Sequence, residues 1–222
     1  MENIVERIAM CVENGKIDSR SPYPPAMKGQ PGADELTLDA LKAGISPTDV
    51  LSQGLIAGMN RIGVKFKENK VFIPQVLMSA KAMSAAMKHL KEYFVDGTVR
   101  HKGQLIIGTV EGDLHDIGKN LVSMIAEGNG YEIIDLGVDV TAEKYLAAIE
   151  EHPNAFVGMS ALLTTTMVNM EKINRAIKER YPHTVTCVGG APLNQEFADR
   201  IGADYYTSEP QALVDILDKL TA

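Results

Sequence analysis

The sequence predicts an α plus α/β protein: an N-terminal helical bundle followed by a flavodoxin-like or Rossmann-like domain with a five-stranded parallel sheet. Two observations carry this prediction. Apolar residues recur at helical spacing through the first hundred residues, whereas short apolar strands alternate with helical segments from residue 104 onward. The charge also divides, since residues 1–100 hold 13 Lys and Arg against 11 Asp and Glu, and residues 101–222 hold 9 against 18. We therefore expect domains at 1–95 and 104–222, joined by a polar linker at 96–103.

The helical part is expected to contain about four helices. Its first apolar face starts at Ile4 and Val5, and the proline-rich and glycine-rich stretch at 21–35 is expected to be a long loop. Ser46 is a suitable N-cap with Pro47 at the first helical position, and this helix is expected to end near Phe66. After the polar turn KENK, a further helix opens at a proline and carries an apolar stripe through residue 90.

The second part reads as alternating strands and helices, which indicates a parallel sheet covered on both faces. The expected order of strands and helices is QLIIGTV, HDIGKNLVSMIAEGNG, YEIIDLG, TAEKYLAAIEEH, AFVGMS, a helix over about 166–180, TVTCVGG, NQEFADRIG, ADYYTS and PQALVDILDKL. Ligands of such sheets bind beyond the carboxyl ends of the strands, so these ends are where a functional site is expected.

The composition argues against several classes of function. The net charge of -7 attracts neither nucleic acid nor an anionic membrane, and the absence of Trp leaves few stacking platforms for nucleic acid. Neither a signal peptide nor a membrane span is expected. Cys11 and Cys187 stand far apart without zinc-binding spacing, so neither a disulfide nor a zinc site is expected, and a cytoplasmic location fits.

The loop after the first expected strand is rich in polar groups. His115 can offer one ring nitrogen to a metal, while Asp113 accepts a hydrogen bond from the other nitrogen. No second His or Cys stands nearby in the sequence to complete a tetrahedral site. A single His ligand suits a metal whose other positions are filled by a macrocycle, although a merely hydrogen-bonded histidine is the alternative.

The ends of later strands add hydroxyls and glycines. Ser160 and three threonines follow the third strand, the pair Gly189-Gly190 follows the fourth, and Thr207 and Ser208 follow the fifth. Taken singly, the glycines are typical of a turn and the threonines of a helix N-cap. The chain lacks the P-loop motif, and its first loop is not GxGxxG, which argues against a dinucleotide site. Together the strand ends predict a polar-edged slot larger than a single metal needs.

These motifs are similar to those of a known family. GTVEGDLHDIGKNLV, then SALLTTT, then VGGAP, resembles the cobalamin-binding domain shared by methionine synthase and the small corrinoid proteins of anaerobic methyltransferase systems, whose signature is DxHxxG, SxL and GG. Residues 54–94 resemble the helical cap that precedes that domain, and the likeness covers residues 36–222. The stretch at 21–35 departs from the shorter leader of the family.

The resemblance implies a cobalamin or related corrinoid cofactor, with His115 as the lower axial ligand of cobalt and Asp113 bonded to it. Thr166 stands where the family commonly has Ser and would complete the hydrogen-bonded relay. Phe66 and Ile73, where the family has Leu or Val at the second position, would lie over the upper face of the cobalt, the alternative being ordinary bundle core. The remaining implied contacts to the corrin and its nucleotide tail are Gly112, Leu114, Asp116, Ile117, Gly118, Ser160, Leu162, Thr164, Gly189 and Gly190.

The implied function is a methyl carrier of one-carbon metabolism. The chain would take a methyl group from a substrate-specific methyltransferase and pass it to a second methyltransferase acting on tetrahydrofolate or coenzyme M, with a reductive activator as a further partner. It is not expected to be catalytic alone. A cobalamin-dependent sensor or regulator and the cobalamin-binding subunit of a mutase are the alternatives. The sequence leaves open the methyl donor and acceptor, the exact corrinoid and the oligomeric state.

Overall fold

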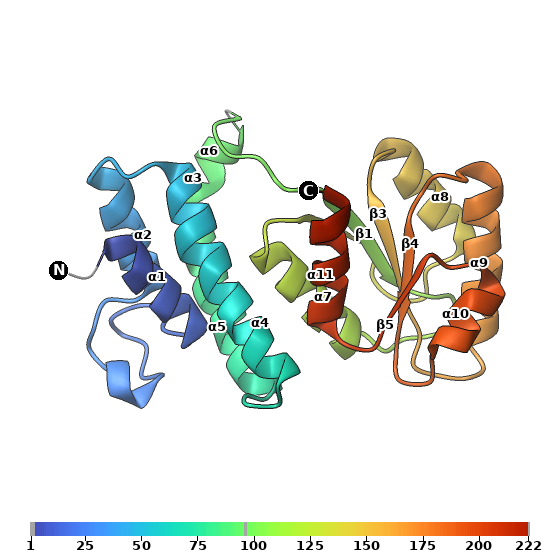
Figure 1. Ribbon diagram of the computed structural model, residues 1–222, viewed down its shortest axis with the longest axis horizontal. Coiled ribbons are helices and arrows are strands. Elements are labelled where there is room, and N and C mark those ends of the chain that lie inside the picture. Colours follow the sequence, from blue (N-terminus) through green and yellow to red (C-terminus); the bar gives the residue numbers. More distant parts are fainter. Residues whose placement is uncertain (1–2, 96, 222) are drawn as a thin grey trace. The chain divides into compact units, whose positions relative to one another are not determined.

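The computed structural model describes residues 3–95 and 97–221 and divides the chain into two compact units, residues 1–100 and 101–222 (Figure 1). The expected linker starts at Asp96, which lies outside the described residues, as do residues 1, 2 and 222 that end the expected domains. The fold class predicted from the sequence is confirmed, because the first unit is helical and the second contains a five-stranded parallel sheet.

The first unit is built from helices that pack through apolar faces, among them Val5, Ile8, Leu55, Met59 and Val76. Its elements are α1 (Ile4–Glu13), η1 (Pro25–Met27), α2 (Ala33–Lys42), α3 (Pro47–Asp49), η2 (Val50–Ile56), α4 (Ala57–Lys67), α5 (Ile73–Met87), η3 (Lys88–Leu90) and α6 (Lys91–Val95).

The expected loop at 21–35 is shorter than predicted, because α2 already starts at Ala33. The side chain of Glu35 explains the early start. Its Oε2 accepts a 2.8 Å hydrogen bond from the N–H of Gly32, and its Oε1 accepts from the N–H and hydroxyl of Ser19 at 2.8 and 2.7 Å. A glutamate inside the helix thus fastens both the helix start and the preceding loop.

The helix expected from Ser46 to about Phe66 is also corrected, because its middle part, η2, is a π-helix. The buried residues of η2 are Val50, Leu51, Gly54, Leu55 and Ile56, and their spacings of four and five positions suit an α-helix as well as a π-helix. Ser46 does occupy the position before the helix, but its side chain makes no capping hydrogen bond.

The second unit alternates strands and helices as the sequence predicts. Its elements are β1 (Gln104–Thr109), α7 (Ile117–Gly128), β2 (Glu132–Asp135), α8 (Ala142–Glu151), β3 (Phe156–Ser160), α9 (Met167–Arg180), β4 (Thr186–Gly189), α10 (Gln195–Ile201), β5 (Tyr205–Thr207) and α11 (Pro210–Thr221). The strand order is β2-β1-β3-β4-β5, which is the flavodoxin-like order. Helices α7 and α11 lie on one face of the sheet, and α8, α9 and α10 lie on the other (Figure 1).

The register of the sheet aligns the last residues of its strands. Thr109 pairs with Ser160, Ser160 with Gly189, and Gly189 with Thr207, so one row of residues crosses the carboxyl edge from β1 to β5. Apolar residues such as Ile106, Val157 and Val188 lie buried behind this row. The strands therefore bring to one edge the residues that the sequence marked at separate positions.

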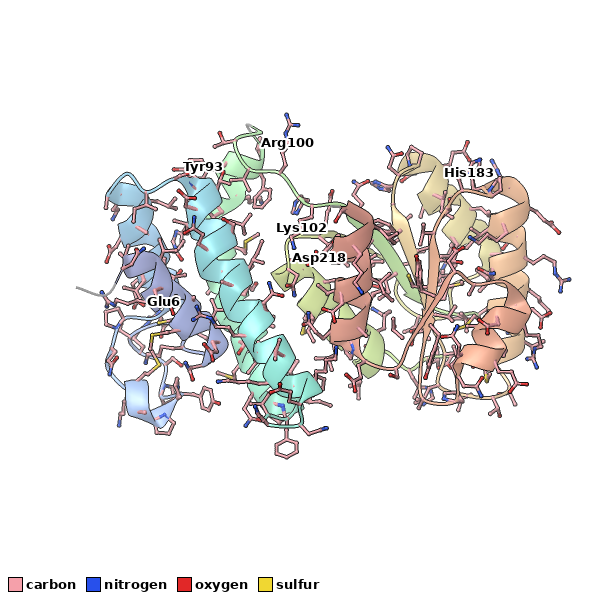
Figure 2. The ribbon with its side chains drawn as sticks, in the orientation of Figure 1. Glu6, Tyr93, Arg100, Lys102, His183 and Asp218 are labelled. Carbon is pink, nitrogen blue, oxygen red and sulfur yellow. The ribbon has the colours of Figure 1, made fainter. Side chains whose placement is uncertain are left out.

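The two ends of the second unit are fastened to each other. Lys102 Nζ lies 2.8 Å from Asp218 Oδ1 on α11, and the hydroxyl of Tyr131 donates to the same oxygen at 2.8 Å (Figure 2). These contacts hold α11 beside the start of β1. Among residues 3–95 and 97–221, no helix is both long and apolar enough to cross a membrane.

Candidate functional site

A cavity of about 660 Å³ opens at the carboxyl edge of the sheet. Nine of the contacts implied by the resemblance line it, together with Thr207 and Ser208 from the end of the fifth strand: Leu114, His115, Asp116, Ile117, Gly118, Ser160, Leu162, Gly189 and Gly190. Its position follows from the strand order. β1 and β3 are neighbours, but the chain continues from β1 to β2 on one side and from β3 to β4 on the other side. Its volume is within the range of pockets that enclose an organic ligand.

His115 lies in the loop between β1 and α7, with its side chain half exposed. Its Nδ1 is 2.7 Å from Asp113 Oδ1, which leaves Nε2 as the ring nitrogen for a ligand. The N–H of His115 donates to the same carboxylate oxygen at 3.1 Å, and the hydroxyl of Thr109 donates to the His115 carbonyl at 2.9 Å. These bonds keep His115 out of the helix, so α7 starts at Ile117 and not at His115 as predicted.

Asp113 is fully buried and is hydrogen-bonded through both oxygens. Its Oδ2 accepts from the N–H of Leu162 at 2.7 Å and from the hydroxyl of Thr166 at 2.8 Å. Burial by itself would raise the pKa of Asp113, but the hydrogen bonds from Leu162, Thr166 and His115 together hold that pKa well below its usual range. The carboxylate is therefore a stable anion directly beside the imidazole.

Thr166 is buried at the start of α9 and has two acceptors for its single hydroxyl proton. Its Oγ1 lies 2.8 Å from Asp113 Oδ2 and 2.8 Å from the carbonyl oxygen of Leu163. Donation to the carboxylate is the stronger bond because its acceptor is charged. His115, Asp113 and Thr166 thus form one hydrogen-bonded chain that leads from the cavity into the protein.

The two glycines at the end of β4 lie where the protein's own backbone leaves little room for a side chain. A Cβ on Gly190 would lie 1.9 Å from the carbonyl oxygen of Ala161, and a Cβ on Gly189 would lie 3.0 Å from that of Thr207. Gly190 also has a φ of 136°, a backbone conformation that residues with a side chain rarely adopt. Both residues line the cavity, but the close approach that excludes a side chain is to the neighbouring loop and strand.

Six of the sequence-predicted residues do not line this cavity within the described part of the chain. Gly112, Asp113 and Thr166 support His115 from behind, and Thr164 is an exposed residue of the turn before α9. Phe66, in α4, is partly buried, and Ile73, the first residue of α5, is 41% exposed; both belong to the other unit.

The sequence reasoning missed several lining residues. Those from α7 and from the β5–α11 region include Lys119, Leu121, Val122, Tyr206, Glu209, Pro210 and Leu213. Lys119 is the unusual one, because its ammonium is buried and lies 2.6 Å from Asp135 Oδ2 and 2.7 Å from Asn120 Oδ1. The motif HDIGK contained the lysine, but only the structure shows that it is paired.

The donor set limits what the site can bind. Within the described ranges, no three His, Cys, Asp or Glu side chains gather closely enough to hold a metal ion. A metal at His115 Nε2 would therefore take its other ligands from a bound molecule, as from a macrocycle. A mainly apolar cavity of about 660 Å³ beside one oriented imidazole fits an organic molecule that brings the other ligands of the metal.

Comparisons with known proteins agree with this chemistry. Residues 103–216 match a family model described as a B12 binding domain, and residues 30–91 match a second model with that description. The chain is 37% identical over 188 residues to dimethylamine corrinoid protein 1 of Methanosarcina acetivorans, which covers 83% of this chain and 88% of the relative.

Two solved structures are similar over nearly the whole chain. The methanol:cobalamin methyltransferase complex of Methanosarcina barkeri matches with a TM-score of 0.84 and 30% identity, over 99% of this chain and 80% of the matched one. A cobalamin-binding protein of Desulfitobacterium hafniense matches with a TM-score of 0.75 and 25% identity, over 97% of each chain.

Proposed function

Because the chain belongs to the B12-binding corrinoid proteins of methyltransferase systems, and its cofactor is accordingly cobalamin or a related corrinoid, we propose that it carries a methyl group between two methyltransferases. One observation supports this most directly. The hydrogen-bonded series His115–Asp113–Thr166, with 2.7 and 2.8 Å between successive partners, leaves Nε2 of His115 available at the cavity. When bound, the corrinoid supplies a cobalt on which a methyl group can be held and transferred.

In this proposal His115 Nε2 would bind the cobalt of the corrinoid. Asp113 fixes the tautomer, because a carboxylate at Nδ1 keeps the proton there and leaves Nε2 free. The residues that would hold the corrin and its tail are Gly112, Leu114, Asp116, Ile117, Gly118, Ser160, Leu162, Thr164, Gly189 and Gly190. Phe66 and Ile73 are the proposed cofactor contacts from the helical unit, and the 41% exposure of Ile73 supports this role because its side chain is not used in the bundle core.

The same residues can manage a proton when the imidazole is not bound to metal. Nε2 is then free to take a proton, and the resulting cation lies 2.7 Å from a carboxylate that stays ionised. Thr166 stabilises that carboxylate by donating to its other oxygen. Asp113 and Thr166 would thus hold His115 in the same position whether or not its Nε2 is bound to metal.

The proposed partners follow from the carrier role. They are a substrate-specific corrinoid methyltransferase, a second methyltransferase acting on tetrahydrofolate or coenzyme M, and a reductive activator. Nucleic acid and membranes are not among them. Both cysteines are free buried thiols, which supports the proposed cytoplasmic location. Two of the similar proteins named above are a dimethylamine corrinoid protein and a methanol:cobalamin methyltransferase complex, and this favours a carrier over a regulator or a mutase subunit.

Reconstitution with hydroxocobalamin tests the proposal. The visible spectrum of the wild-type complex is expected to report an imidazole-ligated cobalt, and His115→Ala is expected to lose those bands. His183→Ala is the matched control, because His183 lies in the turn between α9 and β4 (Figure 2). Failure of the wild-type chain to retain any cobalamin would overturn the proposal, and an unchanged His115→Ala spectrum would remove His115 as the ligand.

The carrier role itself needs a transfer experiment. The chain loaded with methylcobalamin is mixed with coenzyme M or tetrahydrofolate, with and without a methyltransferase for that acceptor. Methyl transfer that depends on both proteins is the expected result. Transfer that proceeds equally well with free methylcobalamin would contradict a carrier function.

A further inference from the structure

The loop that carries His115 is held by a residue from another part of the sheet. Asp139 lies between β2 and α8, next to Val140, which forms a parallel bridge with Val110 at the end of β1. The N–H of Gly112 donates to Asp139 Oδ1 at 2.7 Å, and the N–H of Asp139 donates to the carbonyl oxygen of Asp113 at 3.0 Å. Asp139 is therefore joined to the His115 loop by two hydrogen bonds, one with Gly112 and one with Asp113.

The backbone conformation of both partners is unusual. Asp139 has a φ of 53° and Gly112 a φ of 82°, so each lies in the left-handed region. A residue with a Cβ rarely adopts this conformation, although Asp tolerates it better than most residues. The two bonds to the His115 loop help to maintain this geometry, together with the bond from the N–H of Val140 to the carbonyl oxygen of Thr109.

The carboxylate of Asp139 has no part in capping the next helix. Thr141 is the residue before α8, and Asp139 stands two positions further back. Asp139 is also exposed, so its charge is largely screened by water. Its contribution is consequently the fixed position of one hydrogen-bond acceptor, Oδ1.

That position matters for His115 through Asp113. Both the N–H and the Nδ1 of His115 bond to Asp113 Oδ1, so any displacement of the Asp113 backbone displaces the imidazole. We propose that Asp139 is a positioning residue for His115. Asp139 acts through Gly112 and Asp113, and so directs the Nε2 of His115 into the cavity. This inference rests on the proposed function, in which Nε2 is the cobalt ligand.

Two variants separate geometry from charge. Asp139→Gly keeps the left-handed backbone and the N–H donor to Asp113 but removes Oδ1. Asp139→Asn keeps an Oδ1 acceptor and removes only the charge. The measured quantity is the ratio of imidazole-ligated to unligated cobalt in the hydroxocobalamin complex. In Asp139→Gly this ratio is expected to fall roughly five-fold, which is the factor that corresponds to the loss of one hydrogen bond. Asp139→Asn is expected to match the wild type.

A second measurement uses the protein without cofactor. Long-range ¹⁵N NMR of the imidazoles reports whether His115 holds its proton on Nδ1. Asp139→Gly is expected to show exchange-broadened or mixed-tautomer signals for His115, with His183 unchanged as an internal control.

The outcomes separate the two proposals. If wild-type hydroxocobalamin binding fails but the tautomer changes in Asp139→Gly, the cofactor proposal is overturned and the positioning role stands. If Asp139→Gly matches the wild type in both measurements, or if Asp139→Asn is as defective as Asp139→Gly, the positioning role is overturned.

Discussion

The N–H of Leu162 donates a 2.7 Å hydrogen bond to Asp113 Oδ2, so the loops that follow β1 and β3 meet on one buried carboxylate. The same carboxylate holds His115 through its other oxygen. Since these loops belong to neighbouring strands at the switch point of the sheet, Asp113 sets both the aim of the imidazole and the spacing between two walls of the cavity.

Replacing Asp113 with Asn is expected to lower the free energy of unfolding of the apoprotein by about 1–3 kcal/mol at pH 7, because an amide cannot accept from all the donors that face the carboxylate. The pKa of Asp113 is depressed in the folded state, so its stabilising contribution is complete above the unfolded value of about 3.9 and declines as the pH falls toward the folded value. Urea unfolding from pH 7 to pH 3 measures this. A difference from wild type that stays constant below pH 4 would contradict the assignment, and Asp116→Asn, at an exposed position of the same loop, is the control.

Thr166→Val and Thr166→Ser should differ, because only serine keeps the hydroxyl that donates to Asp113. The valine variant is expected to lose roughly 1 kcal/mol in free energy of unfolding for the missing hydrogen bond, and more of the imidazole-ligated spectrum than the serine variant. Thermal unfolding and the visible spectrum with hydroxocobalamin measure the two effects. Equal losses in both variants would show that the hydroxyl contributes no more than the methyl group, which would contradict its role as the donor to Asp113.

Gly190→Ala is expected to destabilise the protein by at least about 3 kcal/mol, or to prevent folding. Its Cβ would overlap the carbonyl oxygen of Ala161 at 1.9 Å, and a φ of 136° adds strain. Circular dichroism and urea unfolding measure the effect. A variant with the wild-type midpoint would show that the β3 and β4 loops can separate easily.

Gly118→Ala provides the opposite case within the same cavity. No atom outside its immediate chain neighbourhood lies within 4 Å of a Cβ at Gly118, which stands near the start of α7, so alanine is expected to stabilise the apoprotein by up to about 1 kcal/mol. Because Gly118 lines the cavity, the added methyl group is expected to weaken hydroxocobalamin binding roughly ten-fold. Unchanged affinity, measured by titration, would show that the ligand does not approach this glycine.

Much of the fold was predictable because local patterns agree with the tertiary structure. Every predicted strand of the second unit is present, since each is a short apolar run bounded by turn residues. The start of α2 and the π-helix η2 were not predicted. Glu35 fastens α2 through contacts with Ser19, sixteen residues away, and buried residues spaced at four and five positions resemble an ordinary amphipathic helix in sequence.

The site was predictable as far as the strand-end rule was applied. The rule leads to His115, Asp113 and the glycines at the end of β4. Asp139 lies just beyond the end of β2, where no motif in the sequence marks it. The supporting contact from Asn169 to the carbonyl of Glu111, at 2.9 Å, could not be foreseen, because it joins residues 58 positions apart. Such contacts depend on how α9 packs, which no local motif encodes.

The hydrogen bonds to Asp113 also keep its side chain negatively charged at neutral pH. Its oxygens are filled by donors from the protein itself, and its side chain has no exposed surface on which dissolved ions could gather. Dissolved salt weakens attraction between surface charges over about 10 Å at 0.1 M but acts much less on buried pairs. Asp113 is thus shielded from dissolved salt although His115 is half exposed, and the same ring nitrogen is expected to face the cavity at low and at high ionic strength.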